Sequence, residues 1–112
     1  MIATGGWDNN VIFYDTRSPK PVSSFIGPHV CGESLDFNGN SILCGSYRSK
    51  KNLTIWDKRK PHKTIETVNW FGSLETQDPS QNDSLLYAAM YNRNNKDIFA
   101  AGGNAKNEVR IF

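Results

Sequence analysis

Short runs of alternating apolar and polar residues, separated by turns rich in Gly, Asn, Pro and basic residues, make up most of the chain. Three segments share one plan: a short apolar run, a pair of small residues, a polar turn, and an alternating run that ends on an aromatic residue. They are 2–15 (IATGGWDNNVIFYD), 42–57 (ILCGSYRSKKNLTIWD) and 99–112 (FAAGGNAKNEVRIF). Because alternation of this kind is typical of half-buried strands, and no longer run has a helical period of about 3.6, the predicted fold class is all-β.

The spacing of the terminal aromatic residues predicts a structural repeat. Tyr14 and Trp56 are 42 residues apart, which lies within the roughly 40 to 45 residues of a four-stranded propeller blade. Trp56 and Phe112 are 56 residues apart. We attribute the excess to an inserted loop over 68–84, whose polar part begins at residue 71.

Further strands are predicted between the three segments. Residues 22–26 and 62–67 each follow a turn rich in Pro and basic residues, so they occupy equivalent places in the repeat. A hairpin is predicted over 34–44, with an Asn-Gly-Asn turn and with Ser34 opposite Cys44, because Asn-Gly favours backbone conformations with positive φ. The same hairpin pattern recurs towards the C-terminus.

The repeated segments resemble the WD-repeat family of β-propellers. The run GGWDNNVIFYD at 5–15 is similar to the family signature small-Gly-small-x-Asp-x-x-Val-x-x-Trp-Asp, with Tyr14 in the Trp place, and LTIWD at 53–57 supplies the signature Trp-Asp pair itself. The resemblance implies an incomplete propeller of four-stranded antiparallel blades over 1–112. Its implied parts are the end of one blade (1–26), one full blade (27–67), the inserted loop (68–84) and most of a third blade (85–112).

Members of this family often tie each blade together with a hydrogen-bonded set of a His, a Ser or Thr, an Asp and the Trp. The structural blade residues that the resemblance implies are Thr4, Asp8, Tyr14, Asp15, His29, Trp56 and Asp57. Thr4, Asp8 and Tyr14 would form the set of the first blade. In the second blade Cys44 replaces the hydroxyl residue and Arg48 replaces the Asp. Because buried polar side chains need partners, a blade with an incomplete set is expected to rely more on apolar packing.

The number of blades bears on how the protein is completed. A propeller closes its ring with roughly four to eight blades, since an open ring would leave strand edges exposed. The first segment starts at the second strand of a blade, and Phe112 fills the Trp place with no Asp after it. We therefore expect the remaining blades to come from missing sequence or from another chain.

Composition and charge limit the partners. The 112 residues are 38% hydrophobic and carry 13 Lys or Arg against 11 Asp or Glu, so no overall field favours nucleic acid or a membrane. One basic cluster, at 48–51, is predicted on one propeller face and another, at 58–63, on the opposite face, so the two are not expected to form a continuous stripe.

Cellular location is predicted from two further features. No apolar stretch approaches the roughly 20 residues that span a bilayer. Cys31 and Cys44 have no metal-ligand spacing and suit free thiols in a reducing compartment. A cytoplasmic protein is predicted, with the cytoskeleton or the nucleus as alternatives.

Two aromatic residues on neighbouring turns of one face are candidates for binding a partner. Trp7 and Tyr47 occupy equivalent turns in the first two blades, and aromatic residues are enriched at interaction hot spots. The alternative, that they pack against the adjacent blade, stays open. The inserted loop joins the same face, and longer loops often carry function. The candidate partner-binding residues are Trp7, Tyr47, Arg48, Phe71 and Leu74.

No residue pattern predicts catalysis, a cofactor or a metal. His29 and His62 have no companion at ligand spacing, and the sequence contains no Gly-x-Ser-x-Gly, P-loop or His-Glu-x-x-His motif. A propeller hydrolase or lyase would need acidic or His side chains in the central channel, for which Glu33 and Asp36 make a poor set.

The resemblance implies a non-catalytic scaffold for protein–protein interaction. Its partners would be other proteins, within a multi-subunit complex, with neither nucleic acid nor a membrane. The alternative is a permanent structural component of a large cytoskeletal assembly, for example a ciliary or axonemal one, or of a ribonucleoprotein assembly. Burial of both propeller faces, rather than of one, would favour that alternative.

Overall fold

The computed structural model describes residues 1–60, 62–70, 84–104 and 107–112, which form three antiparallel sheets. The first sheet has the order β1 (Ile2–Gly5), β2 (Asn10–Tyr14), β3 (Pro21–Ile26). The second has the order β4 (Leu35–Asn38), β5 (Ser41–Gly45), β6 (Leu53–Asp57), β7 (Thr64–Thr67). The third has the order β10 (Val109–Ile111), β9 (Phe99–Asn104), β8 (Leu85–Tyr91). The described residues contain no helix, and the predicted all-β class is confirmed.

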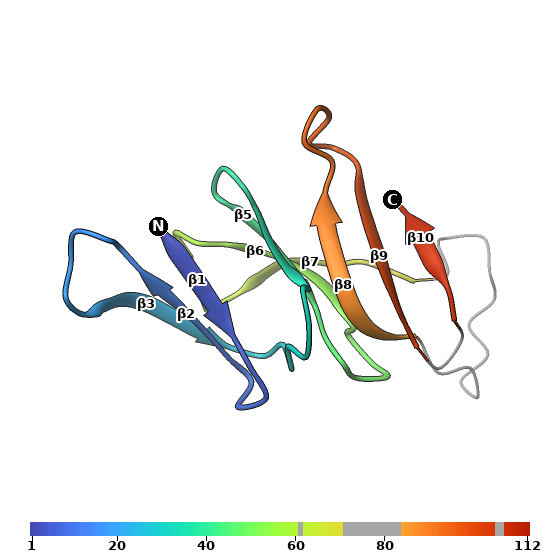
Figure 1. The fold of residues 1–112 in the computed structure, drawn as a ribbon, viewed down its shortest axis with the longest axis horizontal. Helices are drawn as coiled ribbons and strands as arrows, with labels where there is room; N and C mark the ends of the chain where they lie inside the picture. Colours follow the sequence, from blue (N-terminus) through green and yellow to red (C-terminus); the bar gives the residue numbers. More distant parts are fainter. Residues whose placement is uncertain (61, 71–83, 105–106) are drawn as a thin grey trace.

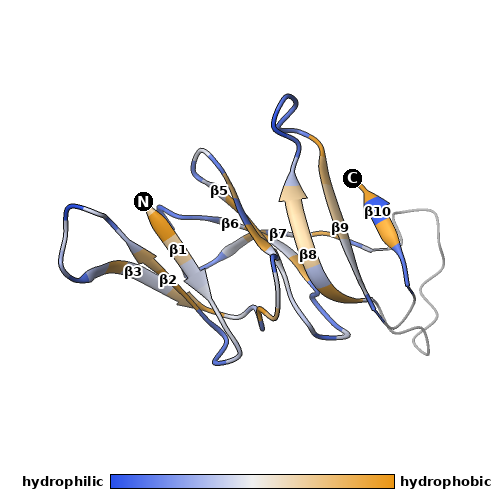
Figure 2. Cartoon of the chain, viewed as in Figure 1, coloured by the Kyte–Doolittle hydropathy of each residue, from blue (hydrophilic) through white to orange (hydrophobic). Residues whose placement is uncertain are grey.

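The three sheets lie side by side along the longest axis of the molecule (Figure 1). The β1–β2 and β5–β6 turns point to the lower edge in this view, and the β4–β5 and β8–β9 turns point to the upper edge. Hydrophobic residues concentrate on the strands, whereas the β2–β3 and β8–β9 turns are hydrophilic (Figure 2). The strands therefore pack against each other while the turns face solvent.

The register of the β4–β5 hairpin differs from the predicted one by a single residue. Leu35, and not Ser34, pairs with Cys44. The turn consists of Gly39 and Asn40 alone, and Gly39 has φ 59°. A glycine with positive φ at the first loop position is typical of a type II′ turn, whose twist matches that of the flanking strands. This two-residue turn replaces the predicted three-residue turn.

The middle sheet buries one face against the first sheet. Trp56 of β6 stacks on Phe25 of β3, with ring centroids 4.2 Å apart and planes 18° apart. The buried residues of this core are Val11, Phe13, Phe25, Ile42, Cys44 and Trp56. A side chain at Gly27 would come within 3.1 Å of the Trp56 ring. The small residue at this position therefore lets the chain cross beside the stack.

The other face of the middle sheet is buried against the third sheet. Its core consists of Leu43, Leu53, Trp70, Leu86, Ala89, Tyr91, Phe99 and Ala101. The two sheets approach closely at Gly45, where a Cβ atom would lie 3.3 Å from the Cβ of Leu86 and 3.4 Å from that of Ala89. Trp70 is held from several sides, because its indole Nε1 donates to Glu108 Oε2 at 2.9 Å and Arg110 lies 5.5 Å from its ring centroid.

The first and the second sheet each have the same kind of polar turn between their last two strands. Arg17 donates from its backbone N–H and from its guanidinium to Asp15, and Arg59 does the same to Asp57. Each Asp–Arg pair is 42 residues from its counterpart, which matches the predicted repeat. Hydrogen bonds from Arg59 lower the pKa of Asp57 to about 2, and hydrogen bonds from Arg17 lower the pKa of Asp15 well below its ordinary value.

We expect the free energy of unfolding to fall as the pH drops from about 4 towards 2. The pKa of Asp57 is near 2 in the folded protein against 3.8 ordinarily, so the unfolded chain takes up a proton first and the stabilisation is lost across this interval. The loss should be modest because the Arg59 side chain is 66% exposed. Urea denaturation at a series of acidic pH values measures it.

The control for this experiment is a carboxylate without an ion pair. Asp57→Asn should show a smaller decline over the same pH interval than the wild type. Asp97 makes no ion pair in the described part of the chain, so Asp97→Asn should keep the full decline. An identical pH dependence of all three proteins would contradict this role of Asp57.

The stack between the first two sheets gives a second prediction. Trp56→Ala should lower the free energy of unfolding by about 3–5 kcal/mol, because it removes a buried aromatic ring and leaves a cavity. Trp7 is 74% exposed, so Trp7→Ala should change stability by less than about 0.5 kcal/mol. Urea denaturation of both variants provides the comparison, and equal losses would show that Trp56 does not hold the sheets together.

Candidate protein-interaction face

Turns and strand ends from all three sheets lie at the edge of the molecule to which the β1–β2 and β5–β6 turns point (Figure 1). The β1–β2 turn supplies Trp7 and Asn9, and the segment between β3 and β4 supplies His29. The β5–β6 turn supplies Tyr47 and Arg48, and the end of β9 supplies Asn104. We call this set, namely Trp7, Asn9, His29, Tyr47, Arg48 and Asn104, the turn face.

Asn9 links the first two sheets at the centre of the turn face. Its Oδ1 atom lies 2.9 Å from His29 Nδ1 and accepts a hydrogen bond of 2.7 Å from Arg48 Nη2. Because a guanidinium only donates, the atom that faces it is the amide oxygen, and His29 must carry its proton on Nδ1 to donate to the same atom. Asn9 also has φ 63°, a left-handed conformation that Asn tolerates better than most residues.

Trp7 is held in an exposed position by His29. The residue is 74% exposed, and the centroid of its ring lies 6.1 Å from that of the His29 ring at an interplanar angle of 28°. The His29 backbone is fixed by the β5–β6 turn, because its N–H donates to Ser46 Oγ and its carbonyl accepts from the N–H of Tyr47. Trp7 therefore both contacts the segment that leads to the next sheet and remains open to solvent.

Tyr47 continues the turn face towards the third sheet. Its hydroxyl accepts a hydrogen bond of 2.6 Å from Asn104 Nδ2. Its ring meets Tyr87 of β8 edge-on, with centroids 6.0 Å apart. Tyr47 is half-buried between the second and third sheets, whereas Arg48 is exposed. The two neighbouring residues thus contact different sheets: Tyr47 contacts the third sheet and Arg48 contacts the first.

The polar set expected in the first blade does not form among the described residues. Thr4 pairs with Ile12 across β1 and β2. The carboxylate of Asp8 instead accepts from the backbone N–H and the side chain of Asn10, at 3.1 and 3.3 Å. These hydrogen bonds lower the pKa of Asp8. The reason is that a turn Asp finds its nearest donor two residues further along its own turn.

The tryptophan of the second sheet also has a different partner from the expected one. Trp56 Nε1 donates to Thr54 Oγ1 at 2.9 Å, on its own strand. Cys44, which occupies the position where the resemblance implies a Ser or Thr, pairs with Thr54 across the β5–β6 ladder. Burial raises the pKa of the Cys44 thiol. The sequence contains the signal for Thr54, since residues two apart on a strand share a face. Asn9 has no comparable local signal.

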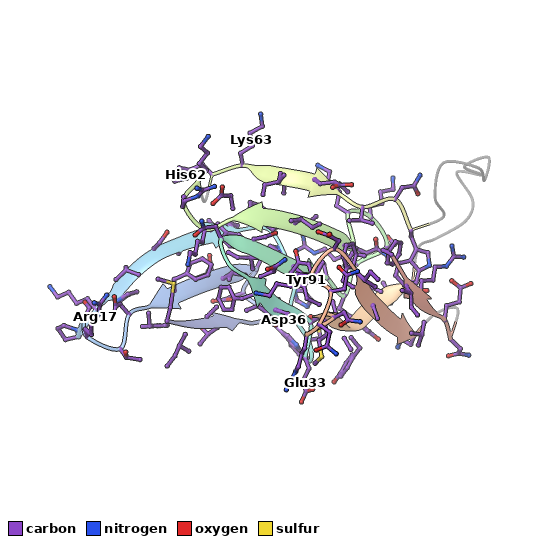
Figure 3. All side chains as sticks on the ribbon, turned by 90° about the horizontal axis from the view of Figure 1, so that it is seen from above. Arg17, Glu33, Asp36, His62, Lys63 and Tyr91 are labelled. Atoms are coloured by element: carbon purple, nitrogen blue, oxygen red, sulfur yellow. The ribbon has the colours of Figure 1, made fainter. Side chains whose placement is uncertain are left out.

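The remaining expected residues are placed as follows. Tyr14 is half-buried at the end of β2, and Asp36 accepts from the N–H of Tyr91, which lies beside it in Figure 3. Phe71 and Leu74 lie outside the described residues, as does most of the predicted inserted loop.

The groups on the turn face suit stacking and hydrogen bonding. They are aromatic rings, amides, an imidazole and a guanidinium. In the described part of the chain no three His, Cys, Asp or Glu side chains gather where they would hold a metal ion. Nor does any described helix have the length and apolarity needed to cross a membrane.

Two known proteins are similar to this chain, although no family model matches it. It is 24% identical over its whole length to the APC/C activator protein CDC20 of Saccharomyces cerevisiae and spans 18% of that protein. Over 52% of its length it is 33% identical to the WD repeat-containing protein srw1 of Schizosaccharomyces pombe and spans 11% of it. The chain thus covers less than a fifth of the length of the curated relatives it matches.

The position of Asn9 gives a prediction for the turn face. Asn9→Gly keeps the left-handed backbone accessible but removes the acceptor shared by His29 and Arg48. We expect it to lower the free energy of unfolding by about 1 kcal/mol, the net value of a typical hydrogen bond. Asn107 has φ 53° as well, so Asn107→Gly carries the same glycine cost in the unfolded chain. Equal losses in the two variants, measured by urea denaturation, would argue against the role of the Asn9 side chain.

Proposed function

Because the chain belongs to the WD-repeat β-propellers, we propose that it is a non-catalytic scaffold that binds other proteins through the turn face. The observation that carries the proposal is the position of Trp7. Trp7 is 74% exposed, and its ring stacks on that of His29, whose backbone is held by hydrogen bonds to the next turn. Exposed, ordered aromatic rings are typical of interaction hot spots.

Side chains that are already ordered in the free protein favour a high affinity for the partner. Fixing a flexible side chain in an interface costs about 0.5–1.5 kcal/mol. On the turn face this entropic cost is lower, because hydrogen bonds already hold Arg48 to Asn9 and Tyr47 to Asn104 in the free protein. A partner that contacts these groups meets them in place. This supports a rigid recognition surface over one that becomes ordered on binding.

The relatives bear on the kind of partner. The alternative role, as a permanent component of a cytoskeletal or ribonucleoprotein assembly, gains no support from them, because neither is named for such an assembly. CDC20 is named as an APC/C activator. We therefore include the APC/C among the candidate partners of the scaffold.

The proposal predicts that Trp7→Ala reduces partner binding at least tenfold, the effect expected of a hot-spot residue. Quantitative affinity capture from cell extract, followed by a dissociation constant for the strongest partner in purified form, measures the loss. Met90 is 51% exposed on β8, and Met90→Ala serves as the control for removing an exposed apolar side chain elsewhere. If both variants capture the same proteins as strongly as the wild type, the turn face is not the binding surface.

A further inference from the structure

A groove of about 410 Å³ runs between the first and second sheets, outside the Phe25–Trp56 stack. One wall is the chain that leaves β3, including Ile26 and Gly27, and the other is the face of β6 and β7 that looks towards the first sheet. The strand register places Trp56 opposite Thr64 and Thr54 opposite Thr67. One aromatic edge and three hydroxyl groups therefore share the β6–β7 side of the groove, whose volume lies in the range of known ligand sites.

Positive charge lines both ends of this groove. The β5–β6 turn contributes Arg48, Lys50 and Lys51 to one end, and Lys63 supplies the charge at the other end, beside the His62 imidazole. Figure 3 shows His62 and Lys63 at the turn before β7, with Lys63 directed away from the sheets. We call the site lined by Arg48, Lys50, Lys51, Trp56, His62 and Lys63 the basic groove.

No described acidic residue balances these charges within the groove. Among the described residues that line it, none is an Asp or a Glu. Glu66, the acidic residue of β7, pairs with Ile55 and so belongs to the face turned towards the third sheet. The lysines of the groove take part in no ion pair within the described ranges.

The basic groove bears on one expectation from the sequence. The two basic clusters were expected to be separated because they belong to turns at opposite ends of the strands. Of the described residues in the second cluster, His62 and Lys63 line the groove. β7 (Thr64–Thr67) follows Lys63 directly, and its last residue, Thr67, lines the groove together with the lysines of the β5–β6 turn. The positions of the turns in the sequence do not show that residues from both clusters line one groove.

The dimensions of the groove favour an extended ligand. β7 has four residues, and at about 3.3 Å per residue it separates the two basic ends by roughly 10 Å. A single phosphate or carboxylate cannot contact both ends at once. An extended peptide of about four residues can, and its backbone amides would meet the threonine hydroxyls between the charges.

We propose that the basic groove binds an extended acidic peptide segment of a partner protein. The inference adds a second site to the proposed scaffold and rests on that function for its context. Since the net charge of the chain is only +2, the attraction is local to the groove and does not arise from the molecule as a whole. Carboxylates spaced along the peptide would contact the lysines at the two ends.

The test uses a fluorescein-labelled peptide of five residues, Glu-Glu-Ser-Glu-Glu, and fluorescence anisotropy with the full chain. The double variant K50E/K63E reverses one charge at each end of the groove. R93E/K96E, in the exposed β8–β9 turn, makes the same change in net charge elsewhere. We expect the groove variant to weaken binding at least tenfold and the control variant to weaken it less than twofold. Amide NMR shifts of Thr64 and Thr67 on adding peptide to the wild type should locate the site without any substitution.

Several results would overturn the proposal. They are no binding of the peptide to the wild type, equal weakening by the two double variants, peptide-induced shifts confined to other strands, or tighter binding of a single-stranded oligonucleotide with the same number of charges. Trp7→Ala separates the two sites, because it should bind the peptide like the wild type. If the chain still captures partner proteins but does not bind the peptide, the basic groove alone is overturned. If it binds the peptide but its capture of proteins does not depend on Trp7, the turn face alone is overturned.

Discussion

The burial of both faces of the middle sheet is the constraint on which the rest of the structure depends. Trp56 and Phe25 close one side, and Leu43 and Leu53 pack against the third sheet on the other. A strand covered on both faces can expose only its edges and its turns. The turn face accordingly lies at the turns, and the basic groove lies between a turn and the outer strands β6 and β7.

Polar contacts at the turns then fix how one sheet sits on the next. Apolar packing is not directional and would tolerate some sliding of one sheet along the other. Asn9 limits such sliding, because its oxygen binds two groups that belong to the second sheet and the segment before it. Tyr47 and Asn104 do the same between the second and third sheets. The contacts that orient the sheets are thus the ones that build the turn face.

The sequence predicted the strands and their repeat well, because alternation and the 42-residue spacing are local properties of the chain. It placed the β4–β5 register one residue off, since an Asn-Gly-Asn run permits both a two-residue and a three-residue turn and only the fit of Leu35 opposite Cys44 decides between them. It missed Asn9 for a different reason. The partner Arg48 lies 39 residues away, and no local pattern encodes a hydrogen bond between the turns of two sheets.

Arg48 belongs to both sites and decides whether they compete. Its Nη2 donates to Asn9 on the turn face, while the same side chain lines the basic groove. A guanidinium carries five N–H donors in a planar fork, so one bond to Asn9 leaves donors free on its other edge. An acidic segment in the groove can use those donors without breaking the Asn9 contact, and a second carboxylate bond would hold Arg48 more firmly in its present orientation. Occupation of the groove should therefore leave the turn face intact, so that one chain can hold two partner segments at once.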